Sequence, residues 1–349
     1  MFSIRPVTSR LSARLLKRRL TDEAVEVRTI APAAERPSRP LLCLPDDPDR
    51  IRGHHPDSSP EVNLARLRGD PIPQRESKAY RLRDVVIADG TVMTRHARAA
   101  ITDSPRRRVL PSPPVQLNDG TLCSTYVTER YFGHWLRDGL SHELWAADNG
   151  SQPLVLPTPP ARVHEPGYRS LTGLKAEHVA HAHVDSLWYL EDHELSDNRI
   201  ERVRRVRARI RAAVSLDGPS HVFLSRGRTG KGRVLDNEQD VQAALVARGF
   251  ALLTPETSTP AEIARTLASA RVVVSPEGSA KAHAALAMPE GGTLVVLQPP
   301  LHFNMVYKTI ADALDIGFAF TVGEVAGRES FVQPLDRLER LLDLVERSR

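Results

Sequence analysis

The stretch "RVVVSPEGSAKAHAALAMPEGGTLVVLQPP", residues 271–300, decides the fold class of this chain. Its apolar run at 272–274 predicts a buried strand, its alanine-rich part at 279–288 predicts a helix, and 292–300 predicts another strand. Two strands joined through a helix are typical of a parallel sheet, whose neighbouring strands need a crossover connection. The sequence therefore predicts an α/β fold.

The same alternation continues on both sides of this stretch. Strands are expected at 221–226 and 250–256, with a helix between them that begins after Asn237 and stops at Gly249. Several such units in a row predict a parallel sheet that is covered on both faces and binds ligands at the carboxyl ends of its strands. We therefore expect a Rossmann-like domain over residues 215–330.

The regions around this domain are less regular. Residues 1–75 are rich in Pro, Arg and Asp, and we expect an irregular N-terminal arm there. Residues 76–214 carry short apolar runs between helical spacings and predict a second α/β domain. The last stretch, 331–349, predicts an amphipathic helix that buries its leucines, and the first domain is one surface that could take them.

A basic helix is expected at 199–214, near the end of the N-terminal domain. Arginines surround an apolar stripe made of Val203, Val206, Ile210 and Ala213. Two interpretations stay open for these arginines: a face exposed to solvent, or a surface that binds a polyanion.

Composition bounds the class of protein. A length of 349 residues allows two domains, and no window approaches the roughly 18–20 apolar residues that cross a bilayer. The two cysteines, Cys43 and Cys123, form neither a disulfide framework nor a zinc site, so we expect a reducing cytoplasm. The net charge of +5 favours anionic partners.

The first twenty residues are basic and lack the apolar core of a signal peptide. Their leucines could line one face of a short helix, which would give peripheral contact with an anionic membrane on its inner face. The alternative is a frayed, arginine-rich start of the chain.

A cluster of basic residues follows the strand expected at 221–226. Glycines alternate there with side chains that suit phosphate oxygens, because guanidinium groups bind them in pairs and glycines let the backbone approach. The spacing is that of neither a Walker loop nor a dinucleotide-binding loop, and a solvated basic loop is the alternative. The candidate nucleotide-binding side chains are Ser225, Arg226, Lys231 and Arg233.

A second candidate group follows the strand at 272–274. Gly278 and Ser279 lie where the helix is expected to begin, and free amides at a helix start favour an anion such as pyrophosphate. Glu277 would then lie close to a ribose, whose hydroxyls a carboxylate accepts. The alternative is that Glu277 or Ser279 only caps the helix.

The segment "YFGHWLRDGLSHELW" at 131–145 holds the candidate catalytic residues. His134 and Asp138 are four residues apart and share one helical face, as a general base and the carboxylate that orients it would. Two alternatives are a structural histidine and a metal site that adds His142 at the next turn.

In this order of motifs, over about residues 120–300, the chain resembles glycosyltransferase family 61. The family typically shows an aromatic-rich helix around a histidine, as at His134, then a Ser-Arg strand end, as at Ser225 and Arg226. Its later His-Gly-Ala-Gly turn is Glu277-Gly278-Ser279-Ala280 here, so the glycine is kept and the histidine is replaced.

The resemblance implies the GT-B type of fold, with two Rossmann-like domains that face each other across a cleft. It also implies a nucleotide-sugar donor, a glycan or lipid-linked hydroxyl acceptor, inversion at the anomeric carbon and no essential metal or cofactor. We therefore expect an enzyme of bacterial capsular or other surface polysaccharide biosynthesis. The alternative is a non-catalytic protein that binds nucleic acid or an acidic glycan through its arginine-rich surface.

Overall fold

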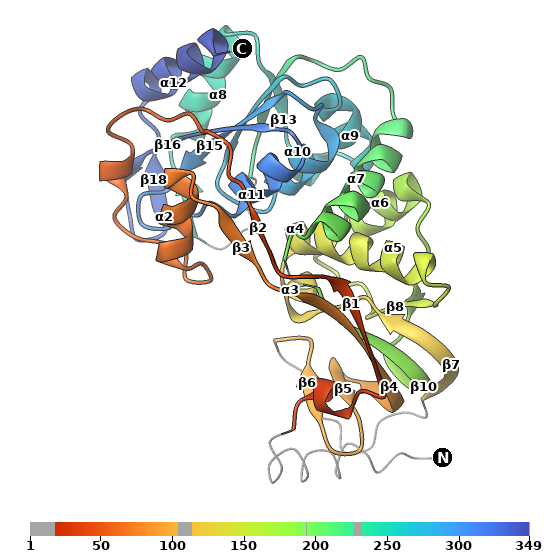
Figure 1. Cartoon of the computed structure of the whole chain (residues 1–349). Helices are drawn as coiled ribbons and strands as arrows, with labels where there is room; N and C mark the ends of the chain where they lie inside the picture. The colour runs from red at the N-terminus through yellow and green to blue at the C-terminus, as the bar shows by residue number, and fades with distance from the viewer. Residues whose placement is uncertain (1–17, 104–113, 193, 227–231, 349) are drawn as a thin grey trace. The chain divides into compact units, whose positions relative to one another are not determined.

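The computed structural model describes residues 18–103, 114–192, 194–226 and 232–348 (Figure 1). The chain forms two compact units. Unit 1 comprises residues 1–34 and 75–206, and unit 2 comprises residues 35–74 and 207–349. The chain thus passes from one unit to the other three times.

Unit 2 is built on a parallel sheet of five strands, in the order β13-β11-β14-β15-β16. In chain order this is second, first, third, fourth and fifth, which is a doubly wound arrangement whose topological switch point lies between β11 and β14. The α/β prediction is confirmed here. The strands are β11 (His221–Leu224), β13 (Ala251–Leu253), β14 (Val272–Pro276), β15 (Thr293–Gln298) and β16 (Gly317–Val322).

Helices follow the strands of this sheet in alternation, as the sequence predicts. The C-terminal helix buries Leu338, Leu341 and Val345 in one cluster with strand residues such as Phe223 and Val274. Its leucines therefore pack within unit 2. The helices are α8 (Glu238–Ala247), η4 (Pro255–Thr257), α9 (Pro260–Leu267), α10 (Lys281–Ala287), α11 (Val306–Ala313) and α12 (Leu335–Arg347).

Residues 35–74, expected as part of an irregular arm, have regular elements and pack in unit 2. The Leu42 amide donates to the Phe318 carbonyl at 3.0 Å, beside β16. Fully buried Asp47 accepts hydrogen bonds from the Val322 amide at 2.8 Å and from Arg337 at 2.7 Å. The elements of this segment are β2 (Ala34–Arg36), η2 (Pro48–Arg50), α2 (Pro60–Arg68) and β3 (Ile72–Gln74), while β12 (Val234–Leu235), β17 (Glu324–Val325) and β18 (Ser330–Val332) form a further small sheet.

Unit 1 is built on a mixed sheet in which β10 pairs antiparallel with β4 and parallel with β7. β7, β8 and β9 continue in parallel, so only this half of the sheet has Rossmann-like pairing. The strands are β1 (Glu26–Ala31), β4 (Ser77–Ala88), β5 (Thr91–Met93), β6 (Arg98–Ala100), β7 (Val115–Leu122), β8 (Pro153–Val155), β9 (Glu177–His178) and β10 (His181–Glu191).

The helices of unit 1 include a rare π-helical turn, η3 (Trp135–Gly139), between α4 and α5. Such turns occur frequently at functional sites. No helix within the described part of the chain has the length and apolar character of a membrane span. The other helices are η1 (Leu20–Glu23), α3 (Tyr126–Arg130), α4 (Phe132–His134), α5 (Leu140–Asp148), α6 (Glu165–Thr172) and α7 (Asp197–Ala212), which continues into the range of unit 2.

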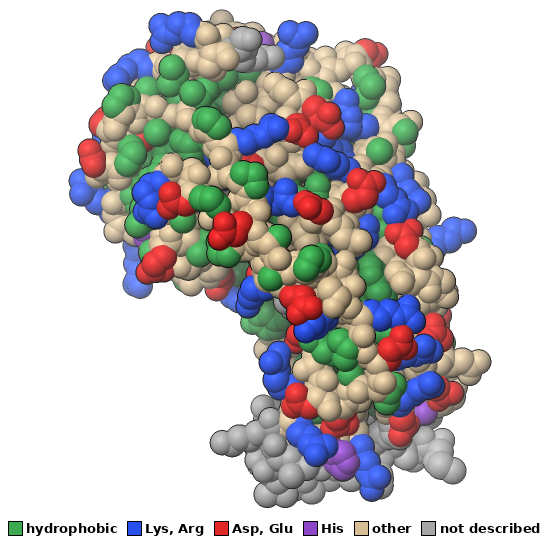
Figure 2. Space-filling view, in the orientation of Figure 1, with side chains coloured by type: hydrophobic (Ala, Val, Ile, Leu, Met, Phe, Trp, Pro, Cys, Tyr) green, Lys and Arg blue, Asp and Glu red, His purple; other side chains and the backbone are tan. Residues whose placement is uncertain are grey.

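The arginines of α7 only partly follow the solvent-exposed interpretation of the sequence, since Arg204 and Arg209 are exposed and others are not. The apolar stripe is buried, as predicted for Val203, Val206 and Ile210, although Ala213 is exposed. Arg199, Arg202 and Arg207 are also buried, so this helix does not present a continuous basic face. The face in Figure 2 likewise shows Lys and Arg side chains interspersed with Asp and Glu.

Candidate functional site

The predicted nucleotide-binding residues of the two strand ends meet at the switch point of unit 2. Arg226 follows β11, and Gly278 follows β14. A Cβ atom on Gly278 would lie 2.7 Å from Arg226 Nε, so the glycine allows the guanidinium to pass directly over the turn. The carboxyl ends of strands at a switch point are where doubly wound folds bind ligands.

Two guanidinium groups share this place. Arg226 Nη1 donates to the Arg233 carbonyl oxygen at 3.0 Å, and Arg233 Nη1 lies 3.8 Å from Glu277 Oε1. Partial burial, and then the charge of Arg233, lower the pKa of Arg226 to about 10. Arg226 therefore still carries its charge at neutral pH.

Glu277 is buried between cations and does not cap the helix. Its Oε2 pairs with Lys281 Nζ, and its Oε1 accepts a hydrogen bond from Asn304 Nδ2 at 3.4 Å. The helix α10 begins at Lys281, and its N-cap position, Ala280, makes no side-chain capping bond. The capping interpretation of Glu277 and Ser279 is therefore wrong.

Lys281 is the residue of this site that the sequence analysis missed. Its side chain is fully buried, and burial lowers its pKa to about 8 although Glu277 raises it. Its Nζ also lies 4.8 Å from the centre of the Tyr307 ring. The four-residue spacing from Glu277 was a signal that could have found this ion pair.

The balance of charge at this place favours an anion. Arg226, Arg233 and Lys281 gather around the buried carboxylate of Glu277, with Glu238 as a further carboxylate that acts on Arg226, and such a concentration of positive charge attracts negative ligands. Ser225 Oγ is buried there without a hydrogen-bond partner among the described residues. Gly278 and Ser279 lie in the turn before α10, and Lys231 lies outside the described residues.

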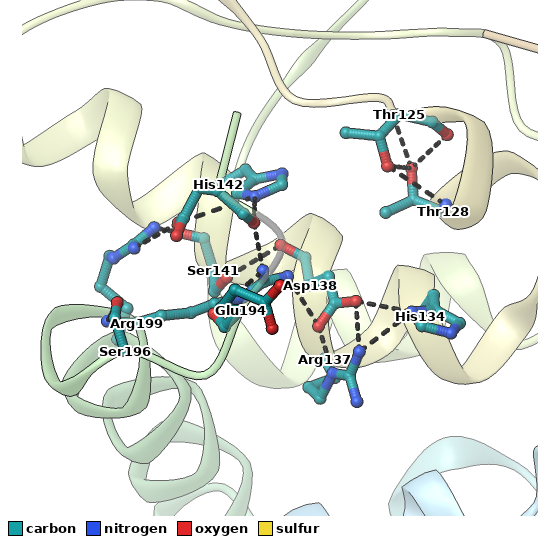
Figure 3. A network of polar contacts seen from close by, with 12 residues as sticks. Thr125, Thr128, His134, Arg137, Asp138, Ser141, His142, Glu194, Ser196 and Arg199 are labelled. Carbon is teal, nitrogen blue, oxygen red and sulfur yellow. Dashed lines mark hydrogen bonds and ion pairs between the residues drawn. The ribbon is translucent and has the colours of Figure 1, made fainter. Parts of the chain in front are cut away.

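The structure also brings together the predicted catalytic pair of unit 1 (Figure 3). His134 Nδ1 lies 2.7 Å from Asp138 Oδ2, while Asp138 also accepts hydrogen bonds from Arg137 and forms an ion pair with Arg199 at 2.8 Å. Burial raises the pKa of Asp138, and the two guanidiniums outweigh this and hold it well below its usual range. Asp138 is thus a buried, permanent carboxylate that cannot itself reach a substrate.

The hydrogen bonds around His134 decide its tautomer. Arg137 Nη2 lies 3.0 Å from His134 Nδ1, but it also donates to Asp138 Oδ2 at 2.5 Å. Because a charge-assisted bond is the stronger one, Nδ1 carries the proton that is donated to Asp138, and Nε2 keeps a free lone pair. The His134 side chain is 31% exposed, so this lone pair is open to a substrate hydroxyl.

His142 does not join His134 and Asp138 in a metal site. Its ring nitrogens lie 3.4 Å from the Cys123 carbonyl oxygen and 3.2 Å from that of Asp192. Burial, followed by the charge of Arg199, lowers the pKa of His142 to about 4, so the ring is neutral. Within the described ranges, no three His, Cys, Asp or Glu side chains are grouped to hold a metal ion.

Two arginines of α7 also bind residues of this network. The sequence did not indicate this role for them. Arg199 forms an ion pair with Asp138 and donates a hydrogen bond to the carbonyl of Asp192. Arg202 donates to the Asp192 carboxylate at 2.6 Å and to the Ser141 carbonyl at 3.0 Å. These partners lie up to 61 residues away in the chain, so no local pattern indicates them.

One comparison with known proteins identifies the region that holds both groups of residues. The family model described as Glycosyltransferase 61 matches residues 132–296, and a search of curated proteins found no match. The matched stretch begins just before His134 and includes Arg226, Glu277 and Lys281. It confirms, over residues 132–296, the resemblance to glycosyltransferase family 61 that is seen in the sequence.

Proposed function

We propose that the protein is an inverting glycosyltransferase that moves a sugar from a nucleotide-sugar donor to a hydroxyl acceptor. The observation that carries the proposal is the pair of partly exposed His134 and buried Asp138 inside the matched stretch. A neutral imidazole that is oriented by a carboxylate and keeps Nε2 free is suited to take a proton from a hydroxyl group.

The donor diphosphate is assigned to the strand ends of unit 2. Arg226 and Arg233 supply fixed positive charge there, with further contacts from Ser225, Lys231 and the amides of Gly278 and Ser279. Glu277 acts as the counterion that holds Lys281 and Arg233 in place. Such preorganised charge stabilises the negative charge that develops on a departing diphosphate.

The chemistry is a single displacement. The acceptor oxygen forms a bond to the anomeric carbon while the bond from that carbon to the diphosphate oxygen breaks. His134 Nε2 takes the acceptor proton, Asp138 stabilises the imidazolium that forms, and the nucleoside diphosphate leaves with the bonding electrons. Inversion follows from attack opposite the leaving group.

The resemblance to the family supports proposals on the fold type, the acceptor and the pathway. We propose a GT-B arrangement, catalysis without a metal ion, and a glycan or lipid-linked acceptor in bacterial surface polysaccharide synthesis on the inner face of the membrane. Uridine, guanosine and cytidine nucleotide sugars are the donors to examine first.

A thermal-shift screen with UDP-, GDP-, CDP- and CMP-sugars would identify the donor, because a ligand of the native state raises the melting temperature. Release of nucleotide from that donor, with water as the acceptor, would then measure turnover. We expect His134→Ala to lower turnover by about 10²- to 10⁴-fold and to leave donor affinity unchanged.

The matched control is His183→Ala, which removes another partly exposed histidine that is paired with a carboxylate, Asp84, at 2.6 Å in the same unit. This variant should turn over normally. Normal turnover of His134→Ala, or a screen without any stabilising donor, would contradict the proposal.

A further inference from the structure

A short N-terminal segment, Arg52–Asp57, docks against the loop that follows β15 in unit 2. The amides of Arg52 and Gly53 donate to the Pro300 carbonyl at 2.8 and 3.0 Å, and the His55 amide donates to the Phe303 carbonyl at 3.0 Å. A Cβ atom on Gly53 would lie 2.7 Å from the Leu301 carbonyl oxygen, so only glycine permits this approach. His55 is therefore held on a fixed piece of backbone.

The hydrogen bonding of His55 fixes its tautomer. The Asp57 amide donates to His55 Nδ1 at 3.2 Å, so Nδ1 is the acceptor and the ring proton is on Nε2. Burial, followed by the charge of Arg233, lowers the pKa of this half-buried ring, which keeps it neutral. The result is an oriented N–H donor at Nε2.

This donor lies beside the cationic group of unit 2. Phe303, which accepts the His55 amide, precedes Asn304, whose side chain donates to Glu277. The charged groups that act on the imidazole are Arg233, Glu277, Asp57 and His302. His55 is thus bound to the residue that precedes Asn304, the hydrogen-bond donor of Glu277, and it lies within electrostatic range of Arg233 and Glu277, although it is more than 170 residues away from both in sequence.

We propose that His55 Nε2–H donates a hydrogen bond to a diphosphate oxygen of the nucleotide sugar. The residue comes from outside the stretch that the family model matches, 132–296, so the N-terminal segment completes the donor site. A phosphate between two guanidiniums gains from a neutral donor, which adds a directed bond without further repulsion among the cations. This inference rests on the proposed function.

Three substitutions of His55 separate its hydrogen bond from its structural role. His55→Asn keeps an oxygen near the position of Nδ1, which can accept the hydrogen bond from the Asp57 amide, but it lacks a donor at the position of Nε2. His55→Gln places an amide N–H near the position of Nε2, and His55→Ala removes both. Binding of UDP, GDP, CDP and inorganic pyrophosphate would be measured by calorimetry.

We expect His55→Ala and His55→Asn to lower the affinity for the bound nucleotide by about 10- to 100-fold. The affinity for pyrophosphate should fall by the same factor. His55→Gln should stay within about 3-fold of the unsubstituted protein. Unchanged affinity in His55→Asn would overturn the inference. Loss of nucleotide affinity with pyrophosphate affinity intact would also overturn it, because His55 would then contact the nucleoside.

Arg226→Ala tells the failure of this inference from the failure of the proposed function. If Arg226→Ala loses binding and His55→Asn does not, only the inference fails. If Arg226→Ala binds normally, or if no nucleotide binds the unsubstituted protein, the donor site itself is misplaced and the inference falls with it.

Discussion

Asp138 in unit 1 and Glu277 in unit 2 are both buried carboxylates surrounded by cations, but the groups that they hold differ in chemistry. Asp138 binds Arg137 and Arg199, and it also binds the partly exposed imidazole of His134. Glu277 binds Lys281 and lies 3.8 Å from Arg233. In unit 1 the group that faces outward is a proton acceptor, whereas in unit 2 it is positive charge.

The comparison teaches that a buried carboxylate sets the function of its neighbour. A histidine oriented by a carboxylate becomes a base, because its free nitrogen is the one that faces the substrate. Guanidiniums that outnumber their carboxylate keep a net charge, which a phosphate can neutralise. Removing each carboxylate should therefore have a different consequence in each unit.

Asp138→Asn should have the largest effect. It removes the buried carboxylate that pairs with Arg137 and Arg199, and breaking a buried ion pair from one side costs about 3–5 kcal/mol. All three tryptophans, Trp135, Trp145 and Trp188, belong to unit 1, so denaturation followed by tryptophan fluorescence reports on this unit. Turnover should fall as well, because His134 loses its orientation.

The control for this prediction is His134→Ala. Its partly exposed ring should contribute less than about 1 kcal/mol to the free energy of unfolding. Equal unfolding midpoints for Asp138→Asn and the unsubstituted protein would mean that the arginines do not depend on this carboxylate.

Glu277→Gln should destabilise unit 2 by about 3 kcal/mol, because it leaves the buried Lys281 ammonium without its carboxylate. The double substitution with Lys281→Met removes both charges, and it should recover most of that loss. Unit 2 has no tryptophan, so hydrogen exchange of β14 and β15 peptides is the suitable measurement.

Additive effects of the two substitutions would show that Glu277 and Lys281 are not coupled. Nucleotide affinity distinguishes the remaining roles of Glu277. If it only positions Lys281 and Arg233, Glu277→Gln should weaken nucleotide and inorganic pyrophosphate alike. If Glu277 holds the ribose directly, Glu277→Gln should weaken the nucleotide more than pyrophosphate.

Local signals predicted the alternating half of the chain well. The apolar runs at β11 and β14 and the stop at Gly249 need only neighbours in sequence, and each appears where the pattern places it. Asn237 does stand at the start of α8, but its side chain binds Gln333 instead of capping the helix. Neighbouring residues indicate that the helix begins at Asn237, but they do not indicate that its side chain binds Gln333.

The rest depends on contacts between distant parts of the chain. The sequence predicted an irregular arm around Asp47, because its partners, such as Val322 and Arg337, lie more than 270 residues away. Arg199 and Arg202 looked like solvated charges, since arginines on a helix usually face water. Only the folded chain brings Asp138 and Asp192 to them.

The smallest effect that we predict is a pH dependence in unit 1. The folded-state pKa of His142 is about 4, below its ordinary value of 6.5, so the unfolded chain binds a proton first as the pH falls. His142 therefore contributes stability above pH 6.5 and loses it as the pH falls toward 4, by about 2 kcal/mol between pH 7.5 and pH 5.

Asp192, with a pKa of about 2, titrates below this window. Glu129 and Glu143, whose pKa values burial raises, change stability in the opposite sense. The measurement is thus the difference between the unsubstituted protein and His142→Gln, followed by tryptophan fluorescence. A parallel pH profile for the two would show that the burial of His142 is not what the acid limb of unit 1 depends on.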